Sequence, residues 1–137
     1  MVINVIPVVF VNCSVFPFIA WIIALSKVFE TRNRNTLKTL IGKRVLLAET
    51  GKGKPIVKCF ATIDYVTRID NKSQYNRYRK QCRIVPGSTY DWIKGKTKYK
   101  YLYHLTDIQS VPEFVPQEVI RHGRTWMEYH GSVPGFD

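Results

Sequence analysis

Acidic residues are scarce in this sequence of 137 residues: ten Asp and Glu stand against 21 Lys and Arg, and the formal net charge is +11 at pH 7. An excess of this size favours an anionic partner, which could be nucleic acid, a nucleotide or an acidic membrane surface. The excess is concentrated, because residues 27–100 hold 19 of the 21 basic residues and only five of the ten acids. The middle of the chain is therefore predicted to form a basic surface.

Cysteine and histidine are also few. Cys13, Cys59 and Cys82 are widely spaced and form no Cys-x-x-Cys pair, and the three histidines show no metal-ligand spacing with each other or with the cysteines. This pattern predicts neither a disulfide framework nor a metal site, and we expect no cofactor. A reducing cytoplasm is the predicted location.

Charged residues are missing from residues 2–26, a stretch long enough to cross a bilayer. No basic residue precedes the apolar run, which argues against a signal peptide. Polar residues and two prolines, Pro7 and Pro17, interrupt the run, and its β-branched cluster at residues 8–11 is typical of a strand. We predict that this strand is followed by a helix over residues 15–25, buried in the core or in a homodimer contact and not in a membrane.

The remaining chain shows short β-strand patterns with a few helical ones and contains no repeat or low-complexity linker. We predict one domain over residues 1–137, of the α+β class: a small mixed β-barrel with a few flanking helices. The expected helices are a turn over 35–40 and a polar helix after Asp70 that ends near Gln81, and the tail is expected to be irregular. The expected strands cover residues 28–32, 43–50, 56–69, 97–105 and 108–114.

Three charged residues stand close together at Lys27, Glu30 and Arg32. In an extended chain Glu30 and Arg32 point to the same face. Cations in such a group can hold a phosphate or bracket a base, and the carboxylate can accept a hydrogen bond from an exocyclic amine. The alternative is an exposed ion-pair group of little energetic consequence.

A second basic group alternates with tyrosines. At a period of two, Lys96, Lys98 and Lys100 share one face of a strand, and the tyrosines between and after them share the other. One interpretation is a lysine ladder that follows a phosphate backbone. The other is a strand with tyrosines packed in the core and lysines that keep an edge soluble.

Five segments between residues 16 and 114 follow one another in a recognisable order: Phe16-Pro17, Ser26-Lys27-Val28-Phe29-Glu30-Thr31-Arg32, Gly42-Lys43-Arg44-Val45-Leu46-Leu47, Tyr103-His104-Leu105-Thr106-Asp107-Ile108 and Val111-Pro112-Glu113-Phe114. Their order resembles that of ASCH domains, the activating-signal-cointegrator homology group of the PUA-like superfamily. The resemblance implies a PUA-like barrel that binds RNA or a modified nucleoside in a basic cleft, with Lys27, Glu30 and Arg32 lining it. Two features depart from the family pattern: Ser26 replaces a usual glycine, and the first helix is unusually apolar.

The same resemblance leaves enzymatic activity open. Some ASCH relatives are similar to amidohydrolases that remove the acetyl group from acetylated cytidine through a Lys-x-x-Thr-x-Arg motif, and others have been proposed as ribonucleases. In this chain Glu30 stands at the threonine position, and Thr31 is one step along the strand, which turns its hydroxyl to the other face. A binding module for RNA or a nucleoside is the leading hypothesis. The alternative is a hydrolase with Lys27 and Glu30 as catalytic residues, Glu30 acting as general base on water.

Overall fold

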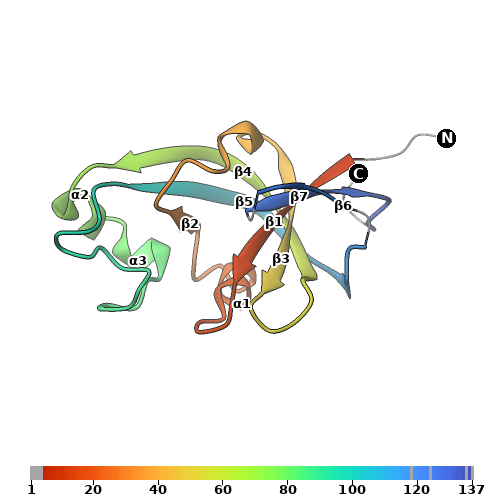
Figure 1. Cartoon of the computed structure of the whole chain (residues 1–137), viewed down its shortest axis with the longest axis horizontal. Helices are drawn as coiled ribbons and strands as arrows, with labels where there is room; N and C mark the ends of the chain where they lie inside the picture. The colour runs from red at the N-terminus through yellow and green to blue at the C-terminus, as the bar shows by residue number, and fades with distance from the viewer. Residues whose placement is uncertain (1–4, 118, 124, 135, 137) are drawn as a thin grey trace.

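The computed structural model describes residues 5–117, 119–123, 125–134 and 136, which form a seven-stranded sheet in the order β2-β5-β4-β3-β1-β7-β6 (Figure 1). Strands β1 and β3 pair in parallel and all other neighbours pair antiparallel, so the sheet is mixed. The strands are β1 Val5–Asn12, β2 Phe29–Arg32, β3 Arg44–Thr50, β4 Ile56–Ile69, β5 Lys100–Phe114, β6 Val119–His122 and β7 Trp126–His130. The helices are α1 Phe18–Ile23, α2 Lys72–Asn76 and α3 Arg79–Cys82, with a 3₁₀ turn at Lys38–Leu40.

The prediction of a mixed α+β fold is confirmed, but the sheet does not close into a barrel. Within the described residues its edges are β2 and β6. A side chain connects β2 with β1, which is not its neighbour in the sheet: Arg32 Nη2 donates a hydrogen bond to the carbonyl of Phe10 at 2.6 Å. In Figure 1, α2 and α3 lie at one end of the sheet, and the hairpin of β6 and β7 lies at the other.

The central strands are buried on both faces, which is why they read as nearly continuous apolar runs. In β1, Val9 and Val11 pack into a core together with α1, while Val8 and Phe10 pack into a second core on the opposite face. Strand β3 alternates in the same way. The first core carries the candidate site at its margin.

The predicted helix over residues 15–25 is present in a shorter form, α1. It begins directly after Pro17 and buries Phe18, Ile19 and Ile22 in the first core, which accounts for its apolar composition. No helix in the described part of the chain is long and apolar enough to cross a membrane. A homodimer contact through α1 stays a prediction that sedimentation would test.

Three predicted elements differ from the structure. The polar helix is split into α2 and α3, and its N-cap is Asn71, whose side chain accepts from the amide of Gln74 at 2.8 Å, because Asp70 is instead paired with Arg68. The two strands expected between residues 97 and 114 are one strand, β5. The tail, expected to be irregular, adds β6 and β7 to the sheet.

The lysine ladder does not form. A turn closed by hydrogen bonds between Ile93 and Thr97 delays the start of β5 to Lys100, so Lys96 and Lys98 lie exposed in a loop. Lys100 itself is only 3% exposed. Of the tyrosines expected on the inner face, Tyr103 is fully buried.

Candidate functional site

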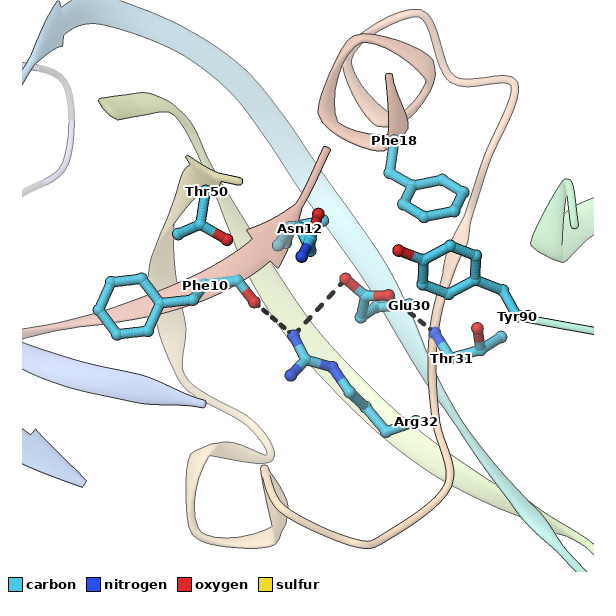
Figure 2. Close-up of a pocket in the computed structure, with 9 residues that line it drawn as sticks. Phe10, Asn12, Phe18, Glu30, Thr31, Arg32, Thr50 and Tyr90 are labelled. Carbon is cyan, nitrogen blue, oxygen red and sulfur yellow. Dashed lines mark hydrogen bonds and ion pairs between the residues drawn. The ribbon is translucent and has the colours of Figure 1, made fainter. Parts of the chain in front are cut away.

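A pocket of about 250 Å³ lies where the ends of β1 and β2 meet the start of α1 and the loop that carries Tyr90 (Figure 2). This volume is slightly below the roughly 300–1,000 Å³ of typical small-molecule sites, so the pocket suits a group no larger than a single base or sugar. Polar and aromatic groups from separate parts of the chain converge on it. Its walls are Phe10, Val11, Asn12, Phe18, Glu30, Thr31, Arg32, Thr50 and Tyr90.

Glu30 supplies the carboxylate of this pocket. It is 7% exposed, and its Oε1 accepts a hydrogen bond from the backbone amide of Thr31 at 3.0 Å. Among the described residues, Oε2 has no hydrogen-bond partner, although it lies 3.7 Å from Nη2 of Arg32. A buried carboxylate oxygen without a donor is costly in a folded protein, so this atom is well suited to accept a hydrogen bond from a ligand.

Arg32 supplies the cation. Its guanidinium bonds the carbonyl of Phe10 and lies beside Glu30, and its side chain keeps 19% of its surface exposed (Figure 2). Glu30 and Arg32 reach the same pocket because they are two residues apart on an extended strand. The structure thus brings these two predicted site residues together.

Lys27 lies elsewhere. Its side chain is fully buried, Nζ donates to the carbonyl of Cys82 at 2.6 Å, and Nζ sits 4.9 Å from the centre of the Phe18 ring. Burial lowers the pKa of Lys27, and the carboxylate of Glu30 offsets part of this effect. The expectation that its ammonium is free to meet a ligand at the mouth of a cleft is therefore wrong. The amides of Ser26 and Lys27 both bond the carbonyl of Trp21 after the end of α1, and the side chain of Lys27 then reaches the carbonyl of Cys82, which the tertiary fold brings close.

Lys100 also has a positioning role. Its Nζ donates to Oδ1 of Asn33 and to the carbonyl of Tyr90, both at 2.9 Å, and burial lowers its pKa. One ammonium thus ties the loop after β2 to the loop that carries Tyr90. Lys96 and Lys98, the other two predicted binding lysines, line a neighbouring groove of about 340 Å³ that also includes Arg34.

No sequence motif marks the aromatic wall of the pocket. The rings of Phe18 and Tyr90 meet edge to face, with centroids 5.0 Å apart, and Phe16 packs against both. Tyr90 follows a Pro-Gly turn, and no periodic pattern marks it as a site residue. Only the fold shows that it lies opposite Glu30 and Arg32.

Comparison with known proteins gives a fold but no family assignment by sequence. No protein-family model and no curated protein matches the chain. Among solved structures, the chain is similar to ASCH from Zymomonas mobilis, with a TM-score of 0.63 and 19% identity over 80% of this chain and 72% of that one. Two mutant proteins of the same ASCH match with TM-scores of 0.65 and 0.69, at 21% and 19% identity, and cover 80% and 88% of this chain and 74% and 84% of theirs. The chain therefore has an ASCH-like fold.

Proposed function

We propose that this protein binds RNA or a nucleoside and that one nucleoside unit occupies the pocket beside Glu30 and Arg32. The observation that carries the proposal is the buried Oε2 of Glu30, which pairs with the guanidinium of Arg32 but accepts no hydrogen bond among the described residues, in a pocket with an aromatic wall. Proteins recognise single-stranded RNA through splayed bases that stack on aromatic or arginine planes and hydrogen-bond at their edges. The net charge of +11 supports an anionic ligand.

The two charged groups have complementary roles in this proposal. Glu30 accepts a hydrogen bond from an exocyclic amino group, as carboxylates do from the amino group of cytosine. Arg32 attracts the phosphate or stacks on the base. Tyr90 and Phe18 exclude water from the polar contacts, which strengthens them.

The proposal predicts a preference for bases with an amino group. Cytidine should bind the wild-type protein at least about tenfold more tightly than uridine, because one good base contact is worth about 1–3 kcal/mol. In Glu30→Gln the ratio should fall towards one, since the amide can also donate to a carbonyl of uracil. Calorimetric titration of both nucleosides measures the ratio. Glu49→Gln, on β3 and outside the pocket walls, is the control. Equal affinities in the wild type would refute this role of Glu30.

If the ligand is a strand of RNA, its backbone can continue into the neighbouring groove. Arg34, Lys96 and Lys98 line that groove, and in the described part of the chain their side chains make no hydrogen bond or ion pair. The groove adjoins the pocket because Asn33 and Tyr90 share the ammonium of Lys100. We propose Arg34, Lys96 and Lys98 as the phosphate contacts, with Lys100 as a positioning residue.

This backbone path predicts a change in salt dependence. Replacing Arg34, Lys96 and Lys98 together by alanine should change how the binding of a short single-stranded RNA depends on salt. The slope of log affinity against log salt concentration should become less steep by about 2. Cytidine binding should be unchanged. Fluorescence anisotropy at several salt concentrations measures the slope. The matched control removes one Arg and two Lys from exposed positions outside this groove: Lys38, Lys72 and Arg77. An unchanged slope in the first variant would show that the RNA backbone does not contact this groove.

Hydrolysis of a modified nucleoside or of RNA is the second candidate function. It is favoured by the same Oε2 of Glu30, which accepts no hydrogen bond among the described residues and could take a proton from a water bound in the pocket. Lys27 would assist through its charge and not by contact with substrate, since it is fully buried. Release of acetate from acetylated cytidine, or cleavage of RNA, by the wild type but not by Glu30→Gln would promote this function over simple binding.

A further inference from the structure

A second concavity, which we call the α3 groove, lies between α1 and the segment that runs from α2 to Pro86. Its volume is about 610 Å³, and it shares no lining residue with the pocket of Glu30 and Arg32. The proposed nucleoside site therefore leaves it unused. It is lined by Trp21, Asn76, Arg79, Lys80, Arg83, Ile84, Val85 and Pro86.

The α3 groove combines an apolar floor with a basic rim. Trp21, Ile84, Val85 and Pro86 supply the floor, and Val85 is 37% exposed. The rim carries three cations and no acidic residue. Lys80 makes no side-chain hydrogen bond or ion pair among the described residues, so its charge is available to a partner.

Among the described residues, Asp91 is the acid that pairs with a cation of the rim, and both of its carboxylate oxygens already accept hydrogen bonds. Oδ2 of Asp91 accepts from Arg79 at 3.0 Å and from the amide of Gly87 at 2.9 Å, and Oδ1 accepts from the amide of Trp92 at 2.8 Å. Through these bonds Asp91 fixes the loop from Gly87 to Trp92 next to the groove. Arg79 is thus partly neutralised, and the cations left for a ligand are Lys80 and Arg83.

Arg83 is held in place in two ways. Its guanidinium lies 4.1 Å from the centre of the Trp21 ring, and it donates a hydrogen bond to Oγ of Ser26. Its backbone is left-handed, with φ of 48°, a conformation that few residues other than Gly and Asn adopt. An arginine in a position that favours glycine suggests that its side chain is needed there.

We propose that the α3 groove docks a short segment of a partner protein in which carboxylates stand beside bulky apolar side chains. The apolar side chains would lie on Ile84, Val85 and Pro86, and the carboxylates would meet Lys80 and Arg83. A nucleic acid is the poorer fit, because the guanidinium of Arg83 covers the indole of Trp21 and the rest of the floor is aliphatic. Single-stranded nucleic acids bind by stacking on open aromatic faces. This partner site is independent of the proposed nucleoside site.

The test is a selection of random 12-residue peptides displayed as a library against the immobilised full chain. The groove variant combines Lys80→Glu with Val85→Asp, two exposed positions on the groove. The control variant combines Lys72→Glu with Val15→Asp, two positions that are also exposed and lie outside the groove. Circular dichroism checks that both variants are folded. If the groove variant does not fold, Lys80→Glu alone replaces it.

We expect the enriched peptides to carry net negative charge together with Leu, Ile, Phe or Trp. Their affinity should fall at least about tenfold in the groove variant, remain unchanged in the control, and weaken with salt because exposed charges are screened. The proposal is overturned if no peptide is enriched, if the enriched peptides are neutral or basic, or if they bind the groove variant as well as the wild type. Displacement of the peptides by a short RNA, with loss of RNA binding in the groove variant, would assign the groove to nucleic acid instead.

Discussion

Lys27→Ala is expected to lower the free energy of unfolding by about 3–4 kcal/mol, a large part of the stability of an ordinary domain. The side chain is fully buried, so its removal leaves a cavity, and such truncations cost about 2–5 kcal/mol. The substitution also removes the donor to the carbonyl of Cys82. Relief of the buried charge offsets part of this loss. Urea unfolding measures the change, and Lys80→Ala, at an exposed position, is the control that should show almost none.

Lys27→Met separates volume from charge. It fills most of the space but cannot donate to Cys82, so the loss should be smaller than for alanine. It also tests the pKa. Burial lowers the pKa of Lys27 in the folded protein below the ordinary 10.5. At pH values between this lowered pKa and 10.5, the unfolded chain therefore binds more protons than the folded chain. The stability of the wild type relative to Lys27→Met should therefore rise as the pH increases through this window.

The quantity to measure is the difference in the free energy of unfolding between the wild type and Lys27→Met. Other groups also titrate at alkaline pH: burial raises the pKa of Cys59 to about 12, which by itself makes stability fall as the pH rises above the ordinary thiol value. Lys100, with a lowered pKa, acts in the same direction as Lys27. Cys59 and Lys100 are present in both proteins, so their contributions to the pH dependence largely cancel in the difference. A difference that stays constant up to pH 10.5 would contradict the conclusion that burial lowers the pKa of Lys27.

Local patterns in the sequence were sufficient for most of the sheet. Strands β3 and β4 lie within one residue of their predicted bounds, because alternation and glycine turns are encoded by neighbouring residues. The approach of Glu30 to Arg32 follows from the same period of two. The hairpin of β6 and β7 was missed because its short strands carry no clear alternation. Pairing of β7 with β1 connects the hairpin to the sheet.

The burial of two lysines could not be predicted from local pattern. Lys27 is satisfied by a carbonyl 55 residues away in the sequence, and Lys100 by an asparagine 67 residues away. Such partners come together only through the tertiary fold. The predicted lysine ladder is absent for a related reason. The turn that ends at Thr97 determines where β5 begins, and alternation alone cannot locate that point.

Arg32→Ala is expected to weaken nucleotide binding about 100-fold while lowering stability much less. The guanidinium is the cation of the pocket, and a charged hydrogen bond with a ligand is worth about 1.5–3 kcal/mol. Without it, the carboxylate of Glu30, which lies 3.7 Å away, would face the ligand alone and repel a phosphate. The fold loses the bond to the carbonyl of Phe10, a cost of about 1–2 kcal/mol at the edge of the sheet.

A comparison of cytidine with its monophosphate separates these effects. In Arg32→Ala the monophosphate should lose more affinity than the nucleoside, because only the phosphate is repelled by Glu30. Arg32→Lys keeps the charge but lacks the planar fork that can serve Phe10 and the ligand together, so its affinity should be intermediate. Calorimetric titration of both ligands gives the two losses, and Arg77→Ala, which is exposed and outside the pocket walls, is the control. Equal losses for the two ligands would show that Arg32 contacts the base or shapes the pocket and does not bind the phosphate.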